Sequence, residues 1–363
     1  MKNQLNFYKK RMSKKKKVIL IVAVILFLFL LAAGLTVYGV IHGFYHASNY
    51  TSDEDAMKDY EQTDEEETID PEDATGDPLT DEELADLDER LKDYYNAEPV
   101  TTDGSVYNVL LIGVDRRDKS WAGNSDTMIL MSINYKKKQV SMISLMRDTY
   151  VNIPGIGMRK LNAAHANGAG PLLVETVTQN YKIQVDRYAS VDFEGMTDII
   201  DKMGGVELTI TEAELPLVNS GAASICQSRG WDADQYVLSE AGTYLCSGAQ
   251  AVSYARIRKV GHADYQRTER QRTVLSKMIE KMKAMSMTEL YDYAQDVLPL
   301  VTHNIPESEM WTILAKSGSI FQYDLVKDRI PYDGLYSVVY VRGQDMLVPD
   351  WETTIQKLKE TLY

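Results

Sequence analysis

The longest uninterrupted run of apolar positions lies near the start of the chain, over residues 18–41, and its 24 positions carry no charge. A helix needs about 20 apolar residues to cross a hydrocarbon core about 30 Å thick. The run is longer than the apolar core of a signal peptide, and no Ala-x-Ala cleavage site is evident after it. The pattern predicts one uncleaved transmembrane helix over 18–41.

Further along the chain, the apolar positions come in short runs that alternate between the spacing of strands and that of helices. The apolar pattern predicts a buried strand over 106–112 that stops at Gly113. It predicts two more strands over 127–134 and 139–145, joined by a polar turn. The other expected strands are 149–153, 187–191, 206–210, 253–258, 338–341 and 346–348, and the expected helices are 163–181, 193–203, 265–283, 289–302 and 351–362. This alternation indicates an α/β fold with a mixed central β-sheet flanked by helices.

Charged residues divide the chain into three zones. Residues 1–17 carry eight Lys or Arg and no acid, residues 51–103 carry 22 acids and three bases, and residues 104–363 carry 31 acids and 28 bases. The net charge of −14 therefore arises in the acidic linker and does not exclude anion binding by the part that follows. Because basic residues beside a membrane span stay in the cytoplasm, we expect everything after the span to be extracytoplasmic.

These zones predict a basic cytoplasmic tail over 1–17, the transmembrane helix over 18–41, an acidic linker over 42–103 and an extracytoplasmic catalytic domain over 104–363. The linker should be loosely extended over 51–78. Thr80 and Glu83 form a capping-box pattern ahead of three leucines that share one helical face, which predicts a helix over 80–95. This helix is either a stalk that packs on the domain or a solvated linker helix.

Five polar residues in the second half of the domain form a candidate anion clamp. Arg256 and Arg258 are two positions apart, so on a strand they point to the same face. Arg270 and Gln271 lie three and four positions after Arg267, so on a helix all three share a face. Guanidinium groups bind phosphate oxygens through paired N–H groups. The sequence thus predicts a phosphate site, with ordinary surface salt bridges as the alternative.

Acidic residues stand where two predicted strands meet a loop. Asp115, followed by Arg116 and Arg117, comes just after the first buried strand, and Asp126 comes just before the next one. In open α/β sheets, ligands bind at the carboxyl ends of strands. If the two strands are neighbours, the two carboxylates suit Mg²⁺, which takes carboxylates together with substrate phosphates and water. The alternative for each Asp is a turn or helix-capping role.

A third polar pair, Arg147 and Asp148, follows the third predicted strand. Asp148 is either a catalytic base or a salt-bridge partner that orients Arg147. The chain has no GxSxG or Walker A motif and no apparent nucleophilic triad. Any chemistry should therefore rest on arginines and a metal ion that handle a pyrophosphate.

The two cysteines, Cys226 and Cys246, lie in a polar stretch of the extracytoplasmic part. An oxidising exterior permits a disulfide that would close a loop of about 20 residues. Two unpaired thiols are the alternative. The spacing does not fit a zinc site, because there is no CxxC and no His at ligand spacing.

Several segments together resemble the LytR–CpsA–Psr family, in order and at the family's spacing. The matching segments are 108–117, 124–130, 140–151, 160–165, 185–195, 201–206, 248–258 and 264–271. Two departures stand out. Met146 occupies a position where proline commonly precedes the Arg-Asp pair, and an insert over 213–247 holds both cysteines.

Carried over residue by residue, the resemblance implies roles for most of the polar residues named above. Asp115 and Asp126 match the family's metal-associated acids, which implies Mg²⁺, or Mn²⁺, as the cofactor. The family's pyrophosphate-binding set is matched by Arg147, Arg256, Arg258, Arg267 and Gln271. Arg117 stands where the GxDxR pattern has its arginine, with Arg116 beside it as the competing assignment.

The resemblance implies a phosphotransferase on the outer face of the membrane. Such enzymes move a glycopolymer from an undecaprenyl-pyrophosphate carrier to peptidoglycan, usually to the 6-hydroxyl of N-acetylmuramic acid, through a phosphodiester. The expected partners are therefore the lipid-linked glycopolymer, the peptidoglycan acceptor and the lipid bilayer.

Two other functions are compatible with parts of the pattern. One is a membrane-bound transcriptional attenuator, but a tail of 17 residues is too short to fold into a DNA-binding surface, and its lysines suit anionic headgroups better. The other is a non-catalytic module that binds polyprenyl pyrophosphate, which needs the arginines but not the acid pair. We expect no nucleic-acid partner, and the sequence does not identify the polymer.

Overall fold

The computed structural model describes residues 38–39, 42–43, 45–58, 68–97, 99–116, 121–260 and 263–363. The basic tail, all of the predicted transmembrane helix except residues 38 and 39, and Arg117 lie outside these ranges. Among the described residues, no helix is long and apolar enough to cross a membrane. Contacts divide the chain into two units, Met1–His46 and Ala47–Tyr363. In the first unit, the rings of Tyr38 and His42 stack with their centroids 5.3 Å apart.

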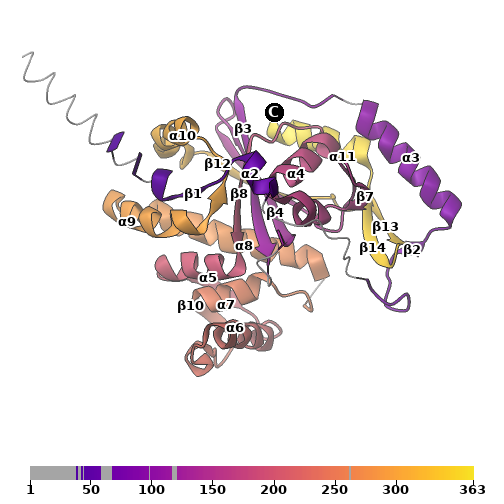
Figure 1. Cartoon of the computed structure of the whole chain (residues 1–363). Coiled ribbons are helices and arrows are strands. Elements are labelled where there is room, and N and C mark those ends of the chain that lie inside the picture. The colour runs from indigo at the N-terminus through magenta and orange to yellow at the C-terminus, as the bar shows by residue number, and fades with distance from the viewer. Residues whose placement is uncertain are drawn as a thin grey trace, which may run out of the picture. The chain divides into compact units, whose positions relative to one another are not determined.

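The second unit contains all of the named elements in Figure 1. Its strands are β1 (Asn49–Tyr50), β2 (Asp77–Pro78), β3 (Val106–Asp115), β4 (Asn124–Asn134), β5 (Gln139–Leu145), β6 (Tyr150–Ile153), β7 (Gly157–Lys160), β8 (Arg187–Asp192), β9 (Val206–Ile210), β10 (Gly242–Cys246), β11 (Thr302–His303), β12 (Asp324–Ile330), β13 (Tyr336–Val341) and β14 (Gln344–Pro349). Its helices are α2 (Asp53–Lys58), α3 (Asp81–Ala97), α4 (Ala163–Tyr181), α5 (Phe193–Lys202), α6 (Leu215–Arg229), α7 (Gly248–Ala255), α8 (Ala263–Ala284), α9 (Met287–Val297), α10 (Glu307–Ile320) and α11 (Trp351–Leu362), with short 3₁₀ turns η1 (Ala233–Tyr236) and η2 (Leu298–Leu300).

The central sheet has the strand order β1-β11-β8-β3-β4-β5-β12 (Figure 1). β3 pairs in parallel with β8 and antiparallel with β4, while β12 joins the other side in parallel with β5. The sheet is therefore mixed, which confirms the predicted α/β class. Nearly all of the predicted strands and helices are present, and β5 and α11 have the predicted bounds.

The first two core strands reach further toward the site than the apolar pattern predicted. β3 continues to Asp115, with a bulge just after Gly113. A Cβ at Gly113 would lie 2.9 Å from the Cβ of Thr127, so glycine allows the two strands to approach closely here. β4 begins at Asn124, and Asn124 pairs with Asp115. The neighbouring ends of β3 and β4 therefore bring Asp115 and Asp126 together, as the hypothesis of a paired acid site required.

Helices cover the sheet in two groups with separate cores. α4 and α11 pack on the sheet in a core that includes Leu110, Ile143 and Leu173. α5, α7, α8 and α9 form a second core with β9, around Ile200 and Val252. The space between the second group and the strands β3 and β4 becomes the cavity described below.

The acidic helix α3 packs on the domain. It lies against the hairpin β13–β14 (Figure 1), where Leu87 is 7% exposed and shares a cluster with Val339 and Met346. Leu84 and Leu91 pack against the same cluster. Of the two interpretations of this helix, the packed stalk agrees with these contacts. Residues 53–58 of the linker, expected to be extended, form α2.

The predicted strand over 253–258 is wrong. Residues up to Ala255 belong to α7, which starts with a capping box between Ser247 and Gln250 and is buried along almost its whole length. The cap and this burial outweigh the strand preference of tyrosine and isoleucine. Arg256 and Arg258 therefore lie in the loop after α7, not on a strand face.

The predicted disulfide is also wrong, because both cysteines are free thiols. Cys226 lies on α6 and packs with Ala222 and Ala249. Cys246 ends β10 and belongs to the second core. Both are fully buried, and a buried free cysteine behaves as a small hydrophobic residue.

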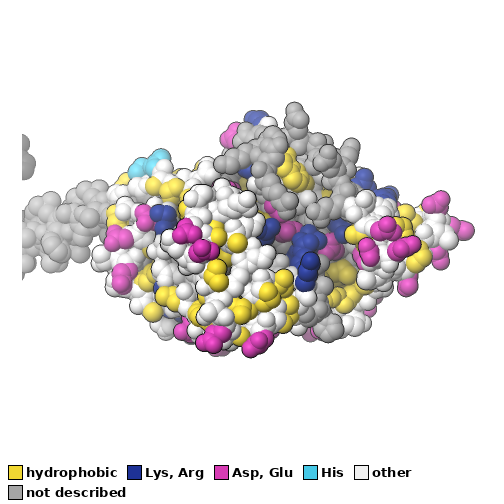
Figure 2. All heavy atoms as spheres, turned by 90° about the horizontal axis from the view of Figure 1, so that it is seen from below, with side chains coloured by type: hydrophobic (Ala, Val, Ile, Leu, Met, Phe, Trp, Pro, Cys, Tyr) yellow, Lys and Arg dark blue, Asp and Glu magenta, His cyan; other side chains and the backbone are white. Residues whose placement is uncertain are grey.

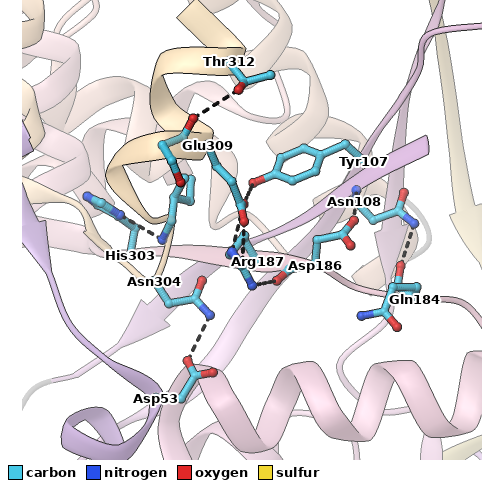
Figure 3. Close-up of polar contacts among 12 residues, drawn as sticks. Asp53, Tyr107, Asn108, Gln184, Asp186, Arg187, His303, Asn304, Glu309 and Thr312 are labelled. Atoms are coloured by element: carbon cyan, nitrogen blue, oxygen red, sulfur yellow. Dashed lines mark hydrogen bonds and ion pairs between the residues drawn. The ribbon is translucent and has the colours of Figure 1, made fainter. Parts of the chain in front are cut away.

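A polar network fixes α10 at the end of the sheet remote from Asp115 (Figure 3). The carboxylate of Glu309 accepts from Tyr107 Oη at 2.8 Å and from Arg187 Nε at 2.9 Å, and its second oxygen pairs with Arg187 Nη2. Beside it, Asp186 accepts from the backbone N–H of Asn108 at 2.7 Å. The network ties the starts of β3 and β8 to α10.

Candidate functional site

A cavity of about 990 Å³ lies between the strands β3 and β4 and the helices α5, α7 and α8. Its wall has two kinds of residue. The interior is apolar and includes Ile112, Ile129, Met196, Ile200, Val274 and Met278. The polar part is formed by Asp115, Asn124, Asp126, Arg147, Asp192, Arg256, Arg258, Lys259, Arg267 and Gln271. In Figure 2, Lys and Arg side chains gather near the centre of the face shown, with acidic and hydrophobic side chains beside them.

Asp126 is the centre of the polar part. Its Oδ1 accepts from Arg147 Nη1 at 2.8 Å, and its Oδ2 lies 3.3 Å from Arg258 Nη2. Burial acts to raise the pKa of Asp126, but the charges of neighbouring arginines, Arg147 foremost, outweigh it and hold the pKa below its usual value. Arg267 and Arg258 are the two other arginines whose charges lower this pKa. Asp126 is therefore a carboxylate at neutral pH. It contacts two of the predicted arginines, Arg147 and Arg258, and is close enough for the charge of Arg267 to act on it.

Asp115 and Arg256 form a looser pair next to it. The Arg256 Nη2 lies 3.9 Å from the Asp115 carboxylate, and its guanidinium carbon lies 4.0 Å from the centroid of the Phe193 ring. A cation over an aromatic face is attracted by the ring and stays in place without giving up its N–H groups. Both side chains line the cavity, so Arg256 can present its donors to an anion there.

α8 contributes two polar cavity residues from the predicted set. Arg267 is 3% exposed and Gln271 follows one turn later, and both line the cavity. Four of the five residues of the predicted clamp therefore line one cavity, and two of them, Arg256 and Arg258, come from a loop.

Arg270 is not part of this group. Its Nε donates to Glu214 Oε1 at 2.7 Å, both residues are buried, and it does not line the cavity among the described residues. The register that places Arg267 and Gln271 on the cavity turns Arg270 toward the start of the insert instead.

Asp148 also lies outside the cavity wall described by the structure. It accepts from Lys160 Nζ at 2.7 Å and lies 3.4 Å from Arg147 Nε. With its oxygens held by two cations, Asp148 fits the role of orienting Arg147, the second of the two roles expected for it.

Arg116 lines a different cavity, of about 300 Å³, together with His165. His165 Nδ1 lies 2.8 Å from the carbonyl oxygen of Gly123. Burial, with the nearby charge of Arg116, lowers the pKa of His165 to about 4, so the imidazole is neutral at physiological pH. Arg116 directly follows the last residue of β3, and the two neighbours Asp115 and Arg116 line different cavities. The competing residue, Arg117, lies outside the described residues.

The sequence analysis did not single out Lys259, Asn124, Phe193 or Asp192, which also line the cavity. Lys259 directly follows Arg258, and this position beside a predicted phosphate-binding residue could have identified it. Asn124 stands two residues before Asp126 in a segment already singled out. Phe193 gave no signal of its own, because only the fold places its ring beneath Arg256.

The acid pair could supply only part of the ligands that a metal ion needs. Nowhere in the described ranges do three or more His, Cys, Asp or Glu side chains gather as a metal site would require. Three carboxylates line the cavity among the described residues. Asp115 and Asp126 lie at the paired ends of β3 and β4, with Asp126 already paired to arginines, and Asp192 caps α5 by accepting from the backbone N–H of Gly195. Two carboxylates fit Mg²⁺ when substrate phosphates and water complete its shell.

Fold and site define an α/β protein whose binding cavity joins a cationic mouth to an apolar interior. The chain belongs to the LytR_cpsA_psr family, whose model matches residues 49–362. Over 196 residues it is 34% identical to the polyisoprenyl-teichoic acid–peptidoglycan teichoic acid transferase TagT of Bacillus subtilis, covering 53% of this chain and 58% of TagT. Over 237 residues it is 32% identical to Biofilm regulatory protein A of Streptococcus mutans, covering 61% of this chain and 55% of that protein.

The fold agrees with the solved structure of TagT bound to LI-WTA. The TM-score is 0.56 at 26% sequence identity, over 74% of this chain and 93% of that chain. The chain spans less than three fifths of the length of the two curated relatives.

Proposed function

We propose that this protein is a transferase that moves a glycopolymer from a polyprenyl-pyrophosphate carrier to peptidoglycan. The observation that carries the proposal is the cavity of about 990 Å³, in which Arg147, Arg256, Arg258, Lys259 and Arg267 stand at one part of a wall that is otherwise largely apolar. A pyrophosphate on a long apolar tail is a ligand with the same two halves. The name of the TagT relative supports the same reaction class.

In the proposed reaction, the guanidinium groups of Arg147, Arg256 and Arg258 bind the pyrophosphate oxygens and stabilise the charge that spreads over the transferred phosphoryl group. The muramic acid 6-hydroxyl attacks the phosphorus that bears the glycan. A new P–O bond forms to that oxygen, the bond to the bridging pyrophosphate oxygen breaks, and polyprenyl phosphate leaves with the electron pair. The hydroxyl proton is released, and Asp148 takes no part beyond orienting Arg147.

Asp115 and Asp126 would hold Mg²⁺ or Mn²⁺, which when bound supplies positive charge for the leaving phosphate. The chain's own contribution is to place both acids next to arginines, whose charges lower the pKa of Asp126. Asp126 also holds Arg147 and Arg258 at 2.8 and 3.3 Å, so it shapes the arginine set even without an ion.

The location belongs to the same proposal. The apolar run over 18–41, with its basic tail, would anchor the protein in the membrane and leave the catalytic domain on the outer side. Protease added to intact protoplasts should then degrade the domain. Cleavage only after permeabilisation would contradict both the orientation and the substrate.

The test of the reaction is transfer of a lipid-linked glycan onto peptidoglycan oligomers by the full chain. We expect activity with Mg²⁺ or Mn²⁺, loss with EDTA, and loss of most turnover in Asp126→Asn with the fold intact. Arg90→Ala is the matched control, since Arg90 pairs with Asp86 on the exposed face of α3, away from the cavity.

The same test separates the other functions. A non-catalytic binding module, or a regulator of the kind that the name of the S. mutans relative suggests, would bind the lipid without forming a peptidoglycan conjugate. Full activity of Asp126→Asn, or activity in EDTA, would remove the metal from the mechanism and leave the arginines alone.

A further inference from the structure

The loop after α7 carries cationic side chains into the cavity without regular secondary structure to hold its backbone. Residues 256–260 carry Arg256, Arg258 and Lys259 into the cavity, yet they form no helix or strand. Long cationic side chains bind a small anion well only when their backbone is held in one place. The contacts that hold this backbone therefore matter to the site, although they do not line the cavity.

One buried side chain supplies those contacts. Arg270 is 5% exposed, and its Nη1 donates to the carbonyl oxygen of Ile257 at 3.2 Å while its Nη2 donates to that of Val260 at 3.3 Å. A single guanidinium group thus bonds to the backbone on both sides of Arg258 and Lys259. The planar fork of arginine suits this double contact, and the single ammonium of lysine does not reproduce it.

Glu214 holds Arg270 in turn. Its Oε1 accepts from Arg270 Nε at 2.7 Å, and its Oε2 accepts from the backbone N–H of Thr211 at 3.0 Å and from the Thr211 hydroxyl at 2.8 Å. Thr211 directly follows β9, so the chain of contacts runs from a strand, through two buried charges, to the loop. Glu214 is 6% exposed and stands at the start of the 213–247 insert.

We propose that Arg270 and Glu214 are positioning residues that hold the loop 256–260 so that Arg256 and Arg258 present their guanidinium groups to a pyrophosphate. The inference rests on the proposed function for the identity of that anion. It assigns a task to the beginning of the insert, and it replaces direct phosphate binding by Arg270 with an indirect role.

The alternative is an ion pair that only stabilises the core. The two differ in what a folded variant should lose. A stabilising pair affects unfolding and leaves the affinities of the folded protein unchanged. A positioning pair affects the loop and the phosphate contacts while leaving the apolar interior of the cavity unchanged.

The experiment uses the full chain in detergent and two variants. Arg270→Lys keeps the charge and loses the fork, and Glu214→Gln/Arg270→Gln removes both charges so that neither is left buried alone. The probes are farnesyl pyrophosphate and farnesol, titrated by calorimetry well below the unfolding temperature. We expect each variant to bind farnesyl pyrophosphate about tenfold more weakly, with farnesol binding unchanged.

A second measurement follows the loop itself. Arg256, Arg258 and Lys259 are trypsin sites, so we expect trypsin to cut the variants within 256–260 several times faster than the parent chain, as mapped by mass spectrometry. Loop cleavage that stays at the parent rate in both folded variants, or equal losses for both probes, would overturn the positioning role. If the parent chain itself binds farnesyl pyrophosphate no better than farnesol while loop cleavage rises in the variants, the proposed function fails and the positioning role stands.

Discussion

The two ends of the paired strands β3 and β8 carry the same kinds of side chain in different proportions. At their starts, Arg187 meets both oxygens of Glu309, and Asp186 and Tyr107 complete the network (Figure 3). At the other end, the cavity wall holds five cations, against three carboxylates in the part of the chain that the structure describes. Among these residues, the first end holds one cation against two carboxylates, and the second holds more cations than carboxylates.

This difference separates a structural ion pair from a binding site. At Glu309, every strong donor nearby already has an acceptor, so an added anion would have to displace one. At the cavity, Asp126 is shared between Arg147 and Arg258, and Arg256 stands 3.9 Å from Asp115. Cations that outnumber carboxylates inside a concave surface attract an anion, and an adjoining apolar wall selects one with an apolar tail.

The largest expected effect comes from removing two of the cations that line the cavity. Arg256→Ala/Arg258→Ala should weaken binding of farnesyl pyrophosphate by roughly two to four decades, because each lost charge-assisted hydrogen bond contributes about 1.5–3 kcal/mol. Isothermal titration measures the change, and thermal unfolding shows whether the fold persists. Binding at parental strength would contradict the assignment of the cavity.

A substitution at the starts of β3 and β8 should reduce the stability of the protein and leave its affinity for the ligand unchanged. Arg187→Ala removes the cation that contacts both carboxylate oxygens of Glu309, so we expect the protein to lose about 1–3 kcal/mol of stability. Its affinity for farnesyl pyrophosphate should stay unchanged. A large affinity loss at unchanged stability would show that the two ends are not separate in function.

The pKa values of carboxyl groups at the two ends should be shifted in opposite directions. Burial raises the pKa of Asp186, whereas the arginines around Asp126 overcome its burial and lower its pKa. Asp126 thus contributes stability that is present above its unfolded-state pKa, near 3.9, and is lost as the pH falls through its lower folded-state value. Asp186 contributes a cost of charging that is relieved as the pH falls. Carbon-detected NMR titration of the two carboxyls would test both signs.

The smallest effect is expected at the cysteines. Because both are free thiols, a reductant should leave the unfolding temperature unchanged. Burial raises the pKa of the Cys246 thiol to about 11, so alkylation should be slow in the folded protein and reach two groups after denaturation. A single disulfide-linked species under non-reducing denaturation would contradict the structure.

Most of the fold was predictable because its strands and helices have clear apolar periods, as in β5 and α11. The failures lie where tertiary packing decides. A helix cap and deep burial give α7 in place of a strand, and the insert's α6 and β10 carry weak periodic signals. Many of the polar residues that line the cavity were named from the sequence, because strand ends and helical spacing can be recognised there. Arg116, Arg270 and Asp148 were named as well, and the structure places them elsewhere. The sequence did not predict that Arg267 would face the cavity while Arg270 pairs with Glu214, because this depends on how α8 is rotated about its axis.

The most direct test of the account is native mass spectrometry of the full chain purified from its own membrane. We expect the parent chain to carry a bound species with the mass of a polyprenyl phosphate or pyrophosphate, with or without a glycan, and Arg187→Ala to carry it equally. Arg256→Ala/Arg258→Ala should lack it. A parent chain without such a lipid, or a double variant that retains it at the parental level, would contradict the claim that the cationic cavity binds a polyprenyl-pyrophosphate substrate.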